Sequence, residues 1–137
     1  IEMLKAARLI YGLNCCQGDA AWLPFDDHSF DLVCMITVLE FAKNPIDILK
    51  ETLRMTRKGL IIGAVNRHSL LGIRRRCKGG PIWGSARLYS VGELSRLLYQ
   101  VIDRPARVHY KTTLWPLFKG SIKLPWGGFI GLCIIFT

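Results

Sequence analysis

Residues 31–65 restrict the fold more than any other part of the chain, because two apolar segments flank a helix with clear start signals. Asp31–Thr37 contains an almost unbroken apolar run and Leu60–Val65 is another, which is typical of strands buried on both faces of a parallel sheet. Between them, Asn44 provides an N-cap residue and Pro45 occupies the first helical position. This pattern predicts a strand–helix–strand unit with two parallel strands.

Start and stop signals predict the remaining elements. Residues 90–93, Ser-Val-Gly-Glu, form a capping box that predicts a helix continuing to about Val101. The sequence also predicts a helix over residues 2–11 capped by Gly12, a short strand over Leu13–Gln17, an end at Gly59 for the Pro45 helix, and an antiparallel strand pair, Arg107–Leu114 with Gly128–Phe136, at the sheet edge.

Charge is distributed unevenly along the chain of 137 residues, which has a net charge of +9. Residues 1–66 hold seven Lys and Arg against eight Asp and Glu, whereas residues 67–137 hold twelve against two. Part of this excess lies in a basic insertion, residues 67–84, which we interpret either as a contact for an anionic or membrane-associated substrate or as a solvated loop. Nucleic-acid binding is disfavoured, because aromatic side chains do not alternate with these charges.

The five cysteines of the chain include no Cys-x-x-Cys pair. Their odd number and their positions in apolar segments indicate reduced thiols in a cytoplasmic protein, and without paired ligand spacing we expect no metal site. The apolar segment 125–137 is too short for a transmembrane helix and contains glycines. Half of the residues are hydrophobic, enough for one domain with a core, which we expect to span residues 1–137.

Asp19 lies at a predicted turn that bears on the function of the protein. It follows the predicted strand Leu13–Gln17, and two small residues, Ala20 and Ala21, come directly after it. In an open α/β sheet, ligands bind outside the carboxyl ends of the strands. A carboxylate there can accept a hydrogen bond from an exocyclic amine while a backbone N–H donates to a ring nitrogen, so Asp19 and Ala20 are candidates for adenine recognition. The alternative is a turn in which Asp19 has only local hydrogen bonds.

Several segments together resemble the class I S-adenosylmethionine-dependent methyltransferases, most closely the small-molecule branch that includes quinone-biosynthesis enzymes. In family order they are EMLKAAR, GDAAWLPFDDHSFDLV, VLEFAKNP, ILKETLRMTRKGLIIGAVNRHSLLG and LPWGGF. The resemblance covers nearly the whole chain. It implies an α/β, Rossmann-like fold with a mostly parallel sheet, helices on both faces and an antiparallel C-terminal strand pair.

The resemblance also implies S-adenosylmethionine as cofactor and an unidentified small molecule as methyl acceptor. Asp19 and Ala20 would contact the adenine ring, and Met3 would pack near the adenosine. Met35 and Ile36 would line the methionine and methyl end of the cofactor.

The start of the chain departs from the family. Its glycine-rich loop and the acid that binds the ribose hydroxyls precede the EMLKAAR helix, and the sequence, which begins with Ile1, contains neither. We therefore expect the N-terminal part of the fold to be missing, the chain to be a fragment of a longer protein, and these residues alone to bind the cofactor weakly. An incomplete sheet would expose apolar strand faces and favour oligomers.

Two residues are weak candidates for catalysis. Glu40 follows the first predicted parallel strand and His68 follows the second, so both lie at the edge where the cofactor is expected. The simpler interpretations are a structural carboxylate and a surface histidine. Four aromatic residues are candidates either for an acceptor pocket or for ordinary packing: Trp83, Tyr89, Trp115 and Trp126.

Three functions remain open from the sequence. The first is methyl transfer from S-adenosylmethionine, and the second is a degenerate, non-catalytic relative that acts as an interaction protein. The third, another α/β nucleotide-binding enzyme such as a dehydrogenase, is disfavoured by the GDA-x-x-LPF corner and by the antiparallel terminal pair.

Overall fold

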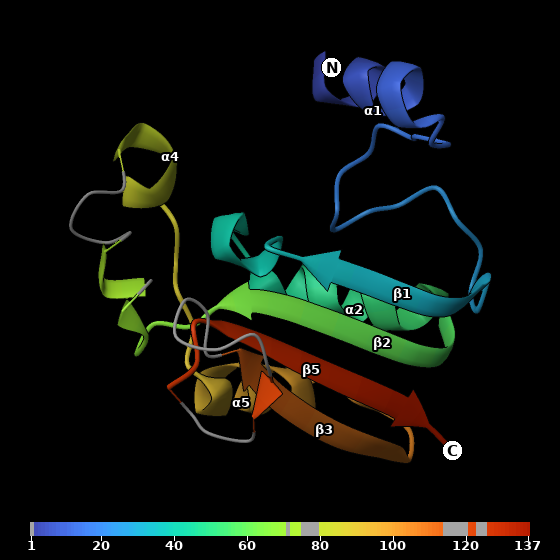
Figure 1. Ribbon diagram of the computed structural model, residues 1–137. Helices are drawn as coiled ribbons and strands as arrows, with labels where there is room; N and C mark the ends of the chain where they lie inside the picture. Colours follow the sequence, from blue (N-terminus) through green and yellow to red (C-terminus); the bar gives the residue numbers. More distant parts are fainter. Residues whose placement is uncertain (1, 71, 75–79, 114–120, 123–125) are drawn as a thin grey trace.

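A computed structural model describes residues 2–70, 72–74, 80–113, 121–122 and 126–137 (Figure 1). Residues 75–79 of the predicted insertion, with Cys77, and Trp115 lie outside the described residues. In chain order the elements are α1 (Glu2–Tyr11), β1 (Phe30–Ile36), the 3-10 helix η1 (Leu39–Phe41), α2 (Pro45–Met55), β2 (Thr56–Val65), α4 (Gly80–Gly84), α5 (Val91–Tyr99), β3 (Ala106–Thr113), β4 (Ser121–Ile122) and β5 (Phe129–Phe136).

The strands form a mixed sheet in the order β1-β2-β5-β3-β4. β1 pairs in parallel with β2, with Ile36 opposite Gly63, which confirms the predicted strand–helix–strand unit. β5 is antiparallel to both β2 and β3. The antiparallel pairing is therefore confirmed, but the predicted place at the sheet edge is wrong for β5, which lies between β2 and β3 (Figure 1).

α2 begins as its sequence predicts, with Pro45 at the first position after Asn44. The Asn44 side chain does not cap the helix but donates from Nδ2 to Asp47 Oδ2 at 2.6 Å. The predicted end at Gly59 is wrong: α2 ends at Met55, and Gly59 lies inside β2. Its Cβ position would be only 3.1 Å from the Ile134 carbonyl oxygen of β5, so glycine here serves close strand packing.

α5 confirms the predicted capping box. Ser90 Oγ accepts from Glu93 N at 3.2 Å, and Glu93 Oε2 accepts from Ser90 N at 2.8 Å. Burial would raise the pKa of Glu93, but these hydrogen bonds and the nearby Arg67 and Arg87 lower it below its usual value. The carboxylate therefore stays charged at the helix start, where it is favourable.

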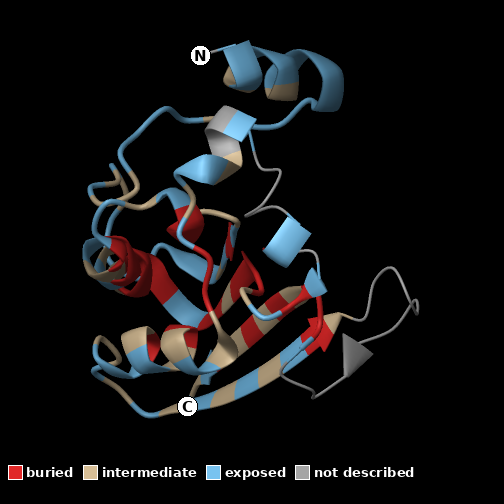
Figure 2. Cartoon of the chain, turned by 90° about the vertical axis from the view of Figure 1, so that its left-hand side faces the viewer, coloured by how far each residue is buried: buried red, intermediate tan, exposed pale blue. Residues whose placement is uncertain are grey.

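The main core lies between one face of the sheet and the pair of helices α2 and α5 (Figure 2). Alternation along β1 and β5 sends every second side chain toward this core. The buried residues of the core come from the strands and from both helices. They include Met35, Leu49, Leu53, Leu60, Ile62, Leu94, Leu98, Ile130, Leu132 and Ile134.

The opposite face of the sheet is more open, which corrects the expectation that β1 is buried on both faces. Leu32 is 57% exposed, Ile36 is 51% exposed, and Cys34 between them is also exposed. Within the described residues β1 pairs with β2 alone, so it is an edge strand, and its alternate side chains face outward.

α1 forms as predicted, and Gly12 ends it in the left-handed conformation with φ +62°. The Gly12 N–H donates to the Arg8 carbonyl at 3.0 Å, as in a helix C-cap. α1 has no buried residue and lies apart from the sheet (Figures 1 and 2). The predicted strand Leu13–Gln17 is wrong: this segment is irregular and pairs with no described strand.

Candidate functional site

A cavity of 410 Å³ lies at the carboxyl end of β1. One wall comes from the turn at Asp19, and the other from the segment that leads from β1 through η1 into α2. This is the rim of the sheet at which α/β proteins bind ligands. The lining residues are Asp19, Ala20, Ala21, Val38, Phe41, Ala42, Lys43, Asn44 and Ile48.

The Asp19 turn is closed by its own hydrogen bonds. Asp19 Oδ1 accepts from Ala21 N at 2.9 Å, and the Asp19 carbonyl accepts from Trp22 N at 2.9 Å. Within the described residues, Oδ2 of the carboxylate has no hydrogen-bond partner. The exposed carboxylate thus keeps one oxygen for a ligand in the cavity, while Ala20 and Ala21 give close access to the backbone.

Thr37 is a feature of this rim that the sequence analysis missed. It follows β1 directly and has φ +53°, a left-handed conformation that is a genuine outlier for a β-branched residue. Its N–H donates to the Gly63 carbonyl at 2.8 Å, and its Oγ1 donates to the Ile36 carbonyl at 2.8 Å. Strained residues of this kind cluster at ligand sites. No sequence signal marks it, because threonine favours extended backbone.

The structure separates the residues expected to hold the rest of the cofactor. Met35 is 6% exposed and faces α2, where Thr52 Oγ1 lies 3.2 Å from its sulfur. Ile36 points to the open face of the sheet, beside Gly63. Met3 lies on α1, is 86% exposed and does not line the cavity with Asp19. Their contacts with a cofactor stay predictions.

Glu40 and His68 occupy different environments. Glu40 is 1% exposed, and its Oε1 accepts from Val65 N at 2.8 Å, which ties η1 to the end of β2. The Glu40 carbonyl accepts from Arg87 N at 2.8 Å. His68 is exposed, and its N–H donates to Asn66 Oδ1 at 3.1 Å. Glu40 therefore has a clear structural contact, whereas His68 presents its ring to solvent.

The aromatic candidates that the structure describes also differ in burial. Tyr89 is fully buried, its hydroxyl donates to the Leu39 carbonyl at 3.3 Å, and burial raises its pKa. Trp126 is 69% exposed. Trp83 of α4 packs against Phe41, with ring centroids 5.5 Å apart. Because Phe41 lines the cavity, this contact brings the predicted insertion next to the candidate site.

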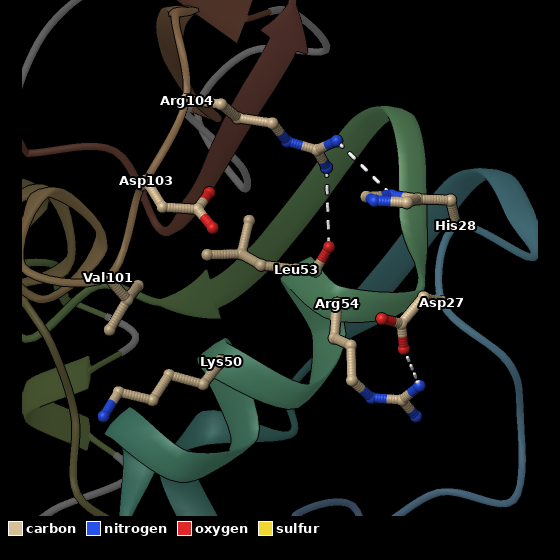
Figure 3. A pocket seen from close by; sticks show the side chains of 8 residues that line it. All are labelled: Asp27, His28, Lys50, Leu53, Arg54, Val101, Asp103 and Arg104. Atoms are coloured by element: carbon tan, nitrogen blue, oxygen red, sulfur yellow. Dashed lines mark hydrogen bonds and ion pairs between the residues drawn. The ribbon is translucent and has the colours of Figure 1, made fainter.

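A larger cavity of 550 Å³ opens at the opposite rim, near the end of α2 and the start of β1 (Figure 3). Three of its charged groups, Arg54, Asp27 and Arg104, already have protein partners: Arg54 Nη1 donates to Asp27 at 2.5 Å, and Arg104 donates to the Leu53 carbonyl at 3.4 Å. The Arg104 guanidinium also lies over the Phe136 ring at 3.8 Å. These contacts stabilise the end of α2, so we place the candidate site at the smaller cavity.

The comparisons with known proteins involve the same part of the chain. A family model described as a methyltransferase domain matches residues 2–62, which include the Asp19 turn, β1 and the whole lining of the smaller cavity. An uncharacterized protein of Methanocaldococcus jannaschii is 46% identical over 73 residues. That match covers 52% of this chain and 35% of the relative, so the matched part spans about a third of its length.

Solved structures extend the likeness to nearly all of the chain. An S-adenosylmethionine-dependent methyltransferase and possible histamine N-methyltransferase from Thermotoga maritima is 26% identical, with a TM-score of 0.82; the match covers 99% of this chain and 70% of that one. Magnesium protoporphyrin IX methyltransferase from Synechocystis, solved with bound S-adenosylhomocysteine, is 14% identical, with a TM-score of 0.61 over 98% of this chain and 57% of that one.

Residues 2–62 thus match a methyltransferase domain, and the fold is similar to that of S-adenosylmethionine-dependent methyltransferases. The cofactor of this class is S-adenosylmethionine. The cavity fits the adenine end of that molecule, since a carboxylate with a spare oxygen lies among small and apolar side chains at the sheet rim. Its volume lies within the range of about 300–1,000 Å³ common for small-molecule pockets.

Two further observations concern membrane-spanning helices and cysteines. Within the described residues, no helix has the length and apolar character needed to cross a membrane. Cys15, Cys16, Cys34 and Cys133 are free thiols.

Proposed function

We propose that the cavity beside Asp19 binds the adenine of S-adenosylmethionine and that the protein transfers the methyl group to a small-molecule acceptor. The observation that carries this proposal is the meeting of the Asp19 turn with Val38 and Phe41 in one cavity. Asp19 Oδ2 would accept from the exocyclic amine, and the Ala20 N–H would donate to a ring nitrogen. Val38 and Phe41 would pack on the faces of the ring.

S-adenosylmethionine supplies an already activated methyl group, so the protein mainly has to orient the reactants and exclude water. Glu40 supports this role indirectly: its buried hydrogen bond to Val65 N holds η1, and with it Phe41, against the end of β2. His68, exposed after β2, is the better placed of the two for proton transfer to or from an acceptor.

The contact between Trp83 and Phe41 suggests where the acceptor enters. Trp83 belongs to the basic segment 67–84, and Phe41 lines the cofactor cavity, so this segment would form part of the acceptor's surroundings. An aromatic wall in the same segment as exposed cations such as Arg74 suits an apolar or aromatic molecule that carries a negative charge.

A second candidate function is a non-catalytic interaction protein with the same fold. The observation that favours it is the strong excess of Lys and Arg over Asp and Glu in residues 67–137. Such a protein would bind an acidic partner without cofactor, and its affinity for that partner would not respond to S-adenosylhomocysteine.

Titration of the full-length protein with S-adenosylhomocysteine by calorimetry tests the proposal. Asp19→Ala should weaken binding by about 10- to 100-fold, because a hydrogen bond to a charged group is worth about 1.5–3 kcal/mol. Asp26→Ala is the matched control, since Asp26 is an exposed acid of the same segment that does not line the cavity. Equal affinity of the Asp19→Ala variant and the wild type would contradict the proposal.

A further inference from the structure

We propose that Glu51 and Arg54 of α2 are positioning residues that hold the Asp19 turn at the rim and so set the affinity for adenine. Neither residue lines the cavity beside Asp19. Both act through the backbone of the segment that follows the turn. This inference rests on the proposed function, because it concerns the same cavity.

Residues 19–28 run alongside α2 without joining the sheet, so their backbone groups need other partners. Side chains of α2 provide them. Glu51 Oε1 accepts from Leu23 N at 2.7 Å, and Arg54 Nη2 donates to the Phe25 carbonyl at 2.7 Å. The Arg54 carbonyl in turn accepts from His28 N at 2.9 Å. The segment is thus bound to one helix at three successive points.

Glu51 and Arg54 also fix each other. Arg54 Nε donates to Glu51 Oε2 and Arg54 Nη2 donates to Oε1, both at 2.9 Å, which is the two-pronged geometry that makes Arg–carboxylate pairs strong. The side chain of Glu51 is only 13% exposed. The hydrogen bonds from Arg54 lower the pKa of Glu51 to about 2, so the carboxylate stays charged at neutral pH.

The position of the turn depends on these bonds because its own hydrogen bonds are internal. The bonds from Ala21 N and Trp22 N to Asp19 fix the shape of the turn but not its place on the rim. After the turn, Leu23 is the first described residue whose backbone is hydrogen-bonded to α2. Ala20 and Ala21 add apolar contacts with the core, whereas Trp22 is 84% exposed.

Loosening the Leu23 contact should therefore reduce the fraction of molecules in which Asp19 is correctly placed. The apparent dissociation constant rises in inverse proportion to that fraction. If the turn is correctly placed in about one molecule in ten, binding of an adenine ligand weakens about tenfold.

The test compares two ligands on the full-length protein: S-adenosylhomocysteine and S-inosylhomocysteine, in which a carbonyl replaces the exocyclic amine. Arg54→Met and Glu51→Gln should weaken binding of the first about tenfold and of the second much less. The preference for the amine should therefore fall. Arg57→Met is the control, because Arg57 forms an exposed ion pair with Asp31 away from the cavity. Glu51→Gln keeps the shape of the side chain and serves if Arg54→Met does not fold.

The outcomes separate this inference from the proposed function. If Asp19→Ala abolishes the preference for the amine and both α2 variants reduce it, the inference is supported. If Asp19→Ala abolishes the preference and the α2 variants leave it at the wild-type value, the inference alone is overturned. If Asp19→Ala leaves the preference unchanged, the proposed function and the inference both fail. Equal weakening of both ligands by the α2 variants would show general destabilisation and would also overturn the inference.

Discussion

Replacing Glu51 by glutamine should lower the free energy of unfolding by at most about 3.5 kcal/mol at neutral pH. The mostly buried carboxylate accepts from Arg54 at 2.9 Å and from Leu23 N at 2.7 Å. Chiefly because of the hydrogen bonds from Arg54, the pKa of Glu51 falls from 4.5 to about 2. Each pKa unit corresponds to about 1.4 kcal/mol, and this conversion gives the upper bound.

The pH dependence of this effect is specific. Because the folded state holds the lower pKa of Glu51, its stabilising contribution is complete above the unfolded value of 4.5 and is lost as the pH falls through about 2. Urea denaturation of wild type and Glu51→Gln should therefore differ most at about pH 7 and progressively less toward about pH 2.5. Glu2→Gln, which alters an exposed ion pair with Lys5, should have little effect at either pH. A difference of equal size at both pH values would refute the reasoning.

Three further substitutions test local features of the fold, each by chemical denaturation. Thr37→Asn should raise the free energy of unfolding by about 1 kcal/mol, because asparagine tolerates φ +53° better than threonine. A lower free energy of unfolding would contradict the claim that Thr37 is strained. Ser90→Ala should cost about 1 kcal/mol through loss of the α5 cap, and an unchanged midpoint would count against that cap. Gly63→Ala should lower the free energy of unfolding by about 1–3 kcal/mol, since the added Cβ would approach Ile36 and Phe129 to 2.8 Å. An unchanged free energy of unfolding would show that both side chains move aside.

Local signals in the sequence predicted those elements that depend on local chemistry. Pro45 at the first helical position marks the start of α2, because proline fixes its own backbone, and the capping box at Ser90 marks the start of α5, because it bonds neighbouring backbone groups. The two apolar runs that flank the helix likewise predicted the parallel pairing of β1 with β2. The corner at Asp19 was predicted as part of the site, and it does line the cavity.

Features that depend on distant parts of the chain were not predictable from sequence. Gly59 looks like a helix cap, but it is needed in β2 for close approach to β5, a contact between residues far apart in the chain. The exposure of Leu32 follows from its direction, since it points to the open face of the sheet, where Ile135 of the central strand is also 47% exposed. The strained backbone of Thr37 and the hydrogen bond from Leu23 to Glu51 have no local signature, since each depends on the packed rim.

Amide chemical-shift mapping tests the central claim, adenine recognition at the Asp19 turn, most directly. S-adenosylhomocysteine is added to the isotope-labelled full-length protein, and backbone shifts are followed residue by residue. The account predicts that the largest changes within this chain fall on Ala20, Ala21 and the segment from Val38 to Phe41. Changes concentrated instead around His28 and Arg104, at the opposite rim shown in Figure 3, would contradict it.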